Sequence, residues 1–235
     1  MEERKKKARV ITVIKEEDYG FGLDEAKKIL QSNGIVAFPT ESFYGLAVNA
    51  LNEEAIQRLF LVKKRQSDQP LLILIHDVNV LPKYVEPVPG IARELMDRFW
   101  PGGLTLIFQA GPNISLLLTA GTGKIGIRLS SHPIATALAR AIDGPITGTS
   151  ANISHQPACI SAEEVDYSLG EEVDLILDGG KTRGGKGSTI VDVTMDPPHI
   201  LREGMIGRDQ IKECVKNPRP SKIPLYFTGK DTALL

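Results

Sequence analysis

The sequence of 235 residues has few cysteines, few histidines and no long apolar segment. Its two cysteines, Cys159 and Cys214, lie far apart and match no metal-binding or redox spacing. We therefore expect reduced thiols in a cytoplasmic protein without a structural disulfide. The histidines are isolated from one another, so the sequence predicts no metal-ligand cluster. His132 is the histidine best placed for chemistry, although it would equally suit a helix N-terminus.

The sequence also has no excess of positive or negative charge. Lys and Arg total 28 against 29 Asp and Glu. This balance argues against non-specific wrapping of nucleic acid, although a local basic groove stays possible. Residues 1–9 are strongly charged, and no apolar segment behind them is long enough for secretion or membrane insertion. Their basic residues suit either a solvated tail or an RNA-binding arm, and we adopt the tail.

Strand-like and helix-like patterns alternate along the chain without a break in composition, which predicts one α/β domain. We place this domain at residues 10–217, between the N-terminal tail, 1–9, and a C-terminal tail, 218–235. The expected strands are 10–14, 35–38, 71–75, 104–108, 125–129, 175–177, 190–193 and 199–201. The expected helices are 24–32, a helix capped by Asn52, 89–99, 132–142, a short helix capped by Ser161, and 206–215.

A block of small hydroxyl residues closed by an asparagine follows the apolar run at 145–146. So many donors and acceptors would lack partners in a protein core. Ser150 and Asn152 are two residues apart, so an extended backbone would place both side chains on one face. The block therefore indicates either a site for a polar ligand or a turn rich in Ser, Thr and Asn.

Cations occur in two unusual positions. Lys63 and Arg65 would share one face if the chain there is extended, whereas a helix would turn them about 200° apart. Together they would form an anion site, and the alternative is a common basic helix end. Arg128 lies among apolar residues of a predicted strand and needs an anion, supplied by an internal carboxylate or by a ligand.

Two glycine-rich segments invite comparison with phosphate-binding loops. Residues 121–124 lack the glycine spacing of the nucleotide-binding P-loop, which excludes that interpretation. Residues 181–189 are basic and end in Ser188 and Thr189, so backbone amides and hydroxyls there could face an anion. A mobile surface hairpin is the alternative.

The candidate site residues share a position at strand ends or in the adjoining loops. They are Thr40, Lys63, Arg65, Arg128, Ser150, Asn152, Ser188, Thr189 and Arg202. Such cations, hydroxyls and an amide suit a phosphate together with a carboxylate-bearing ligand. No carboxylate dyad or thiol nucleophile accompanies them, so positioning and charge stabilisation are the expected means of catalysis, as in phosphoryl or nucleotidyl transfer.

Six motifs follow one another in the order typical of a known family. They are Pro-Thr-Glu-Ser-Phe-Tyr-Gly-Leu at 39–46, Lys-Lys-Arg at 63–65, Pro-Gly-Gly-Leu-Thr at 101–105, Gly-Ile-Arg at 126–128, Thr-Ser-Ala-Asn at 149–152 and Ser-Thr-Ile-Val-Asp at 188–192. Through them the chain resembles the YrdC-type threonylcarbamoyl-AMP synthases, from about Asp24 to Gly204. The resemblance implies a mixed α/β fold, with a twisted mixed sheet flanked by helices and a large, concave, basic cavity.

The resemblance also implies a reaction, in which L-threonine, bicarbonate and ATP, with Mg²⁺, give threonylcarbamoyl-adenylate and pyrophosphate. Partner proteins would then pass the threonylcarbamoyl group to an adenosine of tRNA. It implies that Lys63 and Arg65 are catalytic and that the nucleotide is bound by Lys63, Arg65, Ser150, Asn152 and Arg202. It further implies that Thr40, Arg128 and Ser188 bind threonine or its carbamate.

Three residues depart from the pattern of many family members. Leu74 stands where a histidine is common, Ala47 replaces a glycine, and Gln66 replaces a proline. These departures leave a paralogous carbamoyl-adenylate enzyme as an alternative. A second alternative is a module that binds tRNA or double-stranded RNA without catalysis, against which the neutral charge and the few aromatic residues argue. Because the chain ends soon after the matching region, we expect it to lack the C-terminal domain of longer members.

Overall fold

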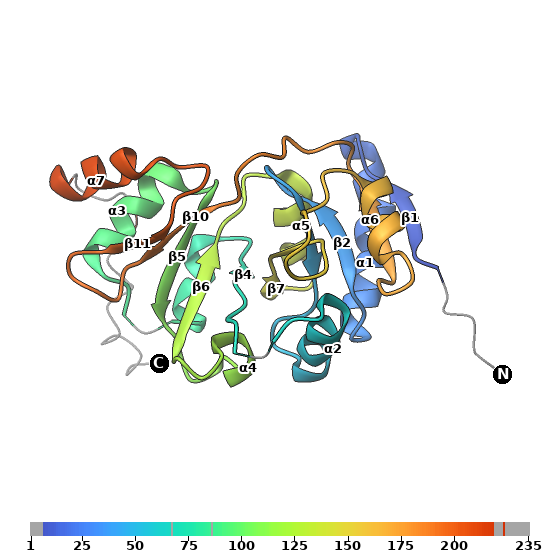
Figure 1. The fold of residues 1–235 in the computed structure, drawn as a ribbon, viewed down its shortest axis with the longest axis horizontal. Coiled ribbons are helices and arrows are strands. Elements are labelled where there is room, and N and C mark those ends of the chain that lie inside the picture. The colour runs from blue at the N-terminus through green and yellow to red at the C-terminus, as the bar shows by residue number, and fades with distance from the viewer. Residues whose placement is uncertain (1–6, 67, 86, 219–222, 224–235) are drawn as a thin grey trace.

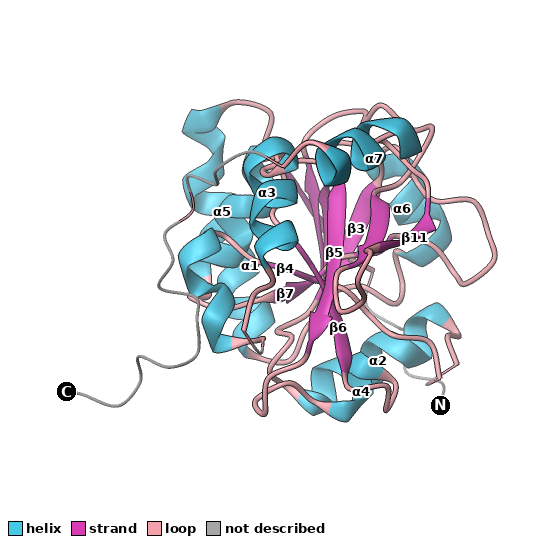
Figure 2. Ribbon diagram, turned by 90° about the vertical axis from the view of Figure 1, so that its left-hand side faces the viewer, coloured by secondary structure: helices cyan, strands magenta, loops and turns pink. Residues whose placement is uncertain are grey.

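The computed structural model describes residues 7–66, 68–85, 87–218 and 223. Its strands form two mixed sheets, with helices on both sides of the strands (Figures 1 and 2). This arrangement confirms the predicted mixed α/β fold and divides its strands between two sheets. No helix in the described part of the chain is both long and apolar enough to cross a membrane.

The first sheet has the strand order β1-β9-β2-β3-β8. Its strands are β1 (Arg9–Thr12), β9 (Leu175–Asp178), β2 (Val36–Pro39), β3 (Tyr44–Ala47) and β8 (Thr149–Ser150). β2 runs parallel to β9 and antiparallel to β3, while β3 is antiparallel to β8. The end of β2, the start of β3 and the end of β8 therefore lie at one end of this sheet, although Pro39 and Thr149 are 110 residues apart in sequence.

The second sheet has the order β11-β10-β5-β6-β4-β7. Its strands are β11 (His199–Arg202), β10 (Thr189–Asp192), β5 (Leu104–Gln109), β6 (Lys124–Arg128), β4 (Ile73–Leu74) and β7 (Ile146–Thr147). The connection from β9 to β10, residues 179–188, passes from the first sheet to the second (Figure 1).

The helices are α1 (Tyr19–Gln31), α2 (Glu53–Lys63), α3 (Gly90–Phe99), α4 (Leu116–Thr119), α5 (Pro133–Ala141), α6 (Ala162–Leu169) and α7 (Arg208–Lys216), with 3-10 turns at Glu16–Asp18 and Val78–Lys83. Asn52 caps α2 as predicted, since its side chain accepts the backbone N–H of Ala55 at 2.9 Å. Ser161 caps α6 in the same way, through the N–H of Glu164.

Successive side chains along a strand point to opposite faces of the sheet, which divides the core into two clusters. Val36 and Phe38 of β2 pack toward α1 and α5 in one cluster, whereas Ala37, between them, belongs to a second. The second cluster continues through α2, α3 and α6 to the inner residues of the other sheet. Both faces of the first sheet are thus covered, which explains why β2 and β9 consist almost wholly of apolar residues.

The predicted elements differ from the structure mainly in length. α1 begins five residues before the expected start at Asp24, and β4 contains only two residues of the apolar run 71–75. No strand was predicted between residues 38 and 71, but Tyr44–Ala47 forms β3. Antiparallel pairing with β2 explains this strand, because it satisfies the backbone of 44–47 while its side chains are buried. β1 already begins at Arg9, and most of the predicted C-terminal tail lies outside the described residues.

Candidate functional site

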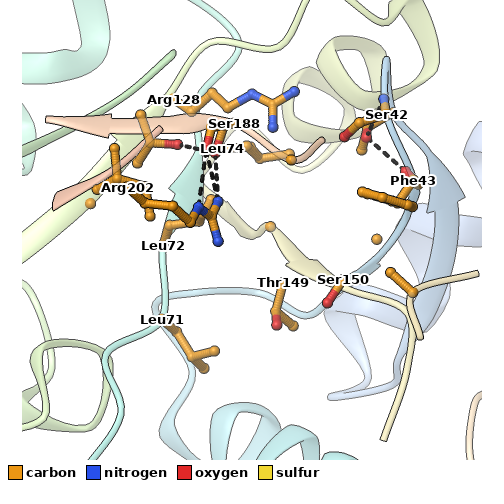
Figure 3. A pocket seen from close by; sticks show the side chains of 18 of the residues that line it. Ser42, Phe43, Leu71, Leu72, Leu74, Arg128, Thr149, Ser150, Ser188 and Arg202 are labelled. Atoms are coloured by element: carbon orange, nitrogen blue, oxygen red, sulfur yellow. Dashed lines mark hydrogen bonds between the residues drawn. The ribbon is translucent and has the colours of Figure 1, made fainter. Parts of the chain in front are cut away.

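A cavity of about 530 Å³ is lined by residues of both sheets and of the loops at their strand ends. Six of the eight residues to which we assigned site roles line it: Thr40, Arg65, Arg128, Ser150, Ser188 and Arg202. In Figure 3, Arg128, Ser188 and Arg202 lie on one side of the cavity and Ser42 and Phe43 on the opposite side. Segments that are distant in sequence therefore meet here, as the motif pattern predicted.

A second cavity of about 200 Å³ adjoins the first, since Arg65 and Ser150 line both. Its lining is almost entirely polar: Lys63, Arg65, Gln69, Ser150, Asn152, Ser154 and His155. It includes the two predicted site residues that the larger cavity lacks, Lys63 and Asn152. The two sequence motifs Lys-x-Arg and Ser-x-Asn thus form one continuous site.

The side chains of Ser150 and Asn152 meet, but not on an extended strand. The Oγ of Ser150 donates to Oδ1 of Asn152 at 2.6 Å. The chain turns at Ala151, because the N–H of Asn152 donates to the carbonyl of Ser150 at 3.0 Å. The backbone here is not extended, and the turn that the sequence left as the alternative is present directly after β8, where its residues line the two cavities.

The chain from Lys63 to Arg65 is not extended either, and the helix end that the sequence left as the alternative is present. α2 continues to Lys63, and Lys64 then adopts a left-handed conformation with φ of 48°. The N–H groups of Lys64 and Arg65 close the helix by donating to the carbonyls of Leu61 and Phe60, each at 3.0 Å. This turn redirects the chain, so that Lys63 and Arg65 reach the same small cavity without being extended.

Lys63 is almost fully buried, with 1% of its surface exposed. Its ammonium group donates to the carbonyls of Ser150 and Asn152, at 2.5 and 2.7 Å, and to Oδ1 of Asn152 at 3.1 Å. Burial, assisted by the positive charge of Arg65, lowers the pKa of Lys63 to about 7. Lys63 is therefore held inside the wall of the site by three oxygens of residues 150 and 152.

Arg65 is less buried, and its described hydrogen bonds go to main-chain oxygens. Its Nη2 donates to the carbonyl of Pro70 at 2.9 Å and its Nε donates to that of Gln69 at 3.4 Å. Burial lowers the pKa of Arg65, whereas the negative charge of Asp68 raises it. Arg65 thus reaches both cavities with its positive charge only partly offset.

Arg128 forms an ion pair with Glu41, and both side chains are largely buried. Its Nε also donates to the carbonyl of Gly102 at 2.9 Å, while the hydroxyl of Ser130 donates to Glu41 at 2.7 Å. Burial alone would raise the pKa of Glu41, but the charge of Arg128 and the hydrogen bond from Ser130 outweigh it and leave this pKa below its ordinary value. The internal carboxylate is therefore the partner that the sequence left open, and Arg128 lines the cavity as well.

Sequence reasoning did not assign a role to Glu41. The available signal was its place as the only carboxylate in the motif at 39–46, beside two hydroxyl residues. Its partner, on β6, lies 87 residues further along the chain, and only the tertiary fold brings the two together. His132 is next to this pair in the fold, and burial lowers its pKa, but it lines neither cavity.

Arg202 and Ser188 form a second polar wall. The guanidinium of Arg202 donates to the carbonyl of Ser188 at 2.8 Å and to its Oγ at 3.3 Å, and Thr105 donates to the same Oγ at 2.8 Å (Figure 3). Burial, and then the positive charge of Arg128, lower the pKa of Arg202. Two guanidinium groups thus influence one another at this side, as expected of a site that holds an anion.

The floor of the larger cavity is apolar and closely packed. Leu71, Leu72 and Leu74 line it, including one of the three positions that depart from the family pattern. A Cβ atom at Gly148 would lie 2.6 Å from a methyl carbon of Leu72 and 2.8 Å from Cγ of Leu74, so only glycine fits there. Among the described residues, the lining contains three arginines and no aspartate or glutamate. Such a cavity suits a ligand with an apolar or planar part and an anionic part.

Within the part of the chain that the structure describes, no group of three or more His, Cys, Asp or Glu residues could hold a metal ion. Mg²⁺ commonly binds to the phosphates of a nucleotide and keeps several water molecules. The hydroxyls of the lining, such as Ser150 and Thr149, are compatible with an ion of this kind carried by a nucleotide.

The sequence profile of the family Sua5_yciO_yrdC, described as "Telomere recombination", matches residues 28–204. The chain belongs to this family. The matched range contains all of the predicted site residues, and it begins and ends within a few residues of the range over which the motifs indicated a resemblance.

Named relatives agree with this assignment. The threonylcarbamoyl-AMP synthase of Bacillus subtilis is 41% identical over 81% of this chain and 56% of its own length. A putative threonylcarbamoyl-AMP synthase of Methanocaldococcus jannaschii is 34% identical over 89% of this chain and 99% of its own length. The crystal structure of Sua5 from Pyrococcus abyssi complexed with L-threonine superposes with a TM-score of 0.83 at 36% identity, covering 88% of this chain and 60% of that one. The chain thus spans little more than half the length of some relatives and nearly the whole of another.

Proposed function

We propose that this protein synthesises threonylcarbamoyl-AMP and pyrophosphate from L-threonine, bicarbonate and ATP. The observation that carries this proposal is the convergence of Thr40, Arg65, Arg128, Ser188 and Arg202 on one cavity, which Arg65 and Ser150 connect to a second, polar cavity. The names of the relatives support it, as does the P. abyssi Sua5 structure, which is a complex with L-threonine.

The polar cavity suits the phosphates of ATP. Arg65, Ser150 and Asn152 line it together with Lys63, and the described residues of its lining include no carboxylate that would repel an anion. In this proposal the adenosine extends into the larger cavity, toward Arg202. The apolar floor of Leu71 and Leu72 offers a surface for a planar base.

Threonine and its carbamate would lie in the same cavity beside the adenosine, between Ser188 and Thr40. Ser188 and Thr40 line this part and supply hydroxyl groups, although Thr40 already donates to the carbonyl of Phe43 at 2.7 Å. Arg128 is held in place by Glu41, so it offers an oriented guanidinium more than a net charge. We assign these three residues to the acceptor substrate.

The chemistry needs positioning and charge stabilisation more than a nucleophile. The amine of threonine condenses with bicarbonate, releasing water, and an oxygen of the resulting carbamate attacks the α-phosphate of ATP as pyrophosphate leaves. Negative charge grows on the phosphate oxygens during this step, and Arg65 is placed to stabilise it. Mg²⁺ bound to ATP would neutralise part of the same charge. The product is of use to partner proteins that transfer the threonylcarbamoyl group to tRNA.

Pyrophosphate release from the purified protein tests this function. The protein is incubated with ATP, Mg²⁺, L-threonine and labelled bicarbonate, and reactions without threonine or without bicarbonate serve as controls. We expect release only when both are present, together with label in an adenylate. Release that is independent of either substrate would contradict the proposal, and tight, salt-sensitive tRNA binding without turnover would favour an RNA-binding module.

A further inference from the structure

The ammonium group of Lys63 has no hydrogen-bond donor left for a ligand. A lysine ammonium carries three N–H donors. In this structure they face three oxygens, namely the carbonyls of Ser150 and Asn152 and the Oδ1 of Asn152. All three distances are 3.1 Å or less, so each donor is engaged in a hydrogen bond of ordinary length.

The main chain of Lys63 is also bonded to the segment that contains Ser150 and Asn152. Its carbonyl accepts the N–H of Ser154 at 2.8 Å, and the side-chain amide of Asn152 donates to the carbonyl of Gln156 at 2.6 Å. The C-terminal residue of α2 is therefore tied to residues 150–154 by both its backbone and its side chain. We call residues 150–156 the Ser-x-Asn turn. This turn contributes Ser150 to the lining of both cavities and Asn152, Ser154 and His155 to the smaller one.

Arg65 differs from Lys63 both in the partners of its hydrogen bonds and in the number of N–H donors that remain free. The hydrogen bonds of its side chain in the described part of the chain go to Gln69 and Pro70, which belong to its own loop. Its guanidinium has five N–H donors, and these bonds use two of its nitrogens. Arg65 lines both cavities and keeps donors for an anion.

We propose that Lys63 is a positioning residue, which fixes the Ser-x-Asn turn and thereby the wall shared by the two cavities, while Arg65 makes the direct contact with phosphate. This role rests on the proposed function, since it concerns the nucleotide end of that site. It revises the sequence-based assignment of Lys63 and Arg65 as an equivalent catalytic pair.

The charged and titratable groups around Lys63 are consistent with a role inside the wall. Arg65 and Cys159 influence its ammonium group electrostatically, and His155 lines the same cavity. A cation that is 1% exposed would have to leave three oxygen partners before it could approach a ligand. The exposed neighbour Lys64 offers a matched control, because it lies beside Lys63 but lines neither cavity.

Nitrogen NMR of the unmodified protein separates contact from positioning. Lysine Nζ and arginine Nε are labelled with ¹⁵N, and pyrophosphate or a non-hydrolysable ATP analogue with Mg²⁺ is added at pH 6, where Lys63 is protonated. We expect the Arg65 Nε–H signal to move and the Lys63 Nζ signal to stay. A movement of Lys63 Nζ comparable to that of Arg65 would overturn this role. Failure of both anions to bind by calorimetry would instead count against the proposed function itself.

A double-mutant cycle on pyrophosphate affinity tests the same role independently. Lys63→Met removes the ammonium group, whereas Asn152→Ala removes one of its three oxygen partners together with the side-chain bonds to Ser150 and Gln156. Both changes loosen the same turn, so each is expected to raise the Kd about tenfold, and the double variant about tenfold as well. Lys64→Gln should leave the Kd unchanged. A hundredfold loss in the double variant would mean that Lys63 and Asn152 act separately on the ligand, and would refute the role. If Lys63→Met does not fold, the NMR experiment on the unmodified protein still decides.

Discussion

The two arginine-bearing sides of the larger cavity hold their charges in different ways. Arg128 is paired with a buried carboxylate, Glu41, so the orientation of its guanidinium is fixed and the pair carries little net charge. Arg65, at the other side, donates to main-chain carbonyls, and its charge remains available to a ligand. The comparison suggests that one side is built for the orientation of a small substrate and the other for the stabilisation of phosphate charge. Four changes of decreasing expected effect test this difference.

The largest effect should come from Glu41→Gln. The substitution leaves Arg128 buried and charged without its carboxylate partner, which typically costs about 3–5 kcal/mol of unfolding free energy. Urea denaturation followed by circular dichroism would measure it. Ser130→Ala removes the hydrogen bond to Glu41 and the one that the same hydroxyl accepts from the N–H of His132, and it should cost about 2 kcal/mol. Similar losses of unfolding free energy in both variants would show that the ion pair contributes no more to stability than the hydrogen bonds of Ser130.

The stability of the wild type at low pH tests the same ion pair. Because the pKa of Glu41 in the folded protein lies below its ordinary value of 4.5, the unfolded state binds more protons in the interval between the two. The contribution of Glu41 to stability is therefore complete above about pH 4.5 and is lost as the pH falls through the lowered pKa. Glu41→Gln should lack this part of the acid transition.

Arg65→Met should have the next largest effect, now on activity. Loss of one charge-stabilising group typically lowers turnover by about 100-fold, which corresponds to about 2.7 kcal/mol. We expect this loss in kcat for pyrophosphate release with little change in stability, because Arg65 is only partly buried. Lys64→Met is the control for removal of a nearby charge. An Arg65 variant with normal turnover would remove this residue from the mechanism.

A smaller effect concerns the pH dependence of stability. The pKa of Lys63 is about 7 in the folded protein, against an ordinary value of 10.5. Between these values the unfolded state binds more protons, so the unfolding free energy should rise with pH, by at most about 1.4 kcal/mol per pH unit. Denaturation at pH 7, 8 and 9 would show the rise in the wild type and in Lys64→Met, but not in Lys63→Met. Parallel curves for all three proteins would contradict a lowered pKa of Lys63 in the folded protein.

The smallest effect should follow from Lys64→Gly. Lys64 is exposed and left-handed, with φ of 48°, a conformation that glycine adopts without strain. The gain is reduced by the greater freedom of glycine in the unfolded chain, so we expect stabilisation below about 1 kcal/mol. Lys64→Val, which is β-branched, should instead lose stability. Neutral stability of both variants would contradict a strained left-handed conformation at Lys64.

Much of the fold could be predicted from local patterns. The caps at Asn52 and Ser161 and the apolar runs of β2, β5 and β6 were found in sequence because their signals lie within a few residues. β3 was missed, since Tyr44–Ala47 is a strand only through its pairing with β2 and β8. The residues proposed for the site could be picked out because their motifs are short and their spacing is characteristic, and the structure places them in the lining of the two cavities.

The sequence by itself determined which side chains could hold an anion, and the tertiary structure decided how each is used. The sequence placed each of the pairs Ser150–Asn152 and Lys63–Arg65 on one face only if the backbone is extended, yet a turn and a left-handed helix end bring each pair together. The partner of Arg128 and the three oxygens around Lys63 come from residues 87–89 positions away. Burial then determines whether a cation is free for a ligand, and burial depends on the packing of the whole chain.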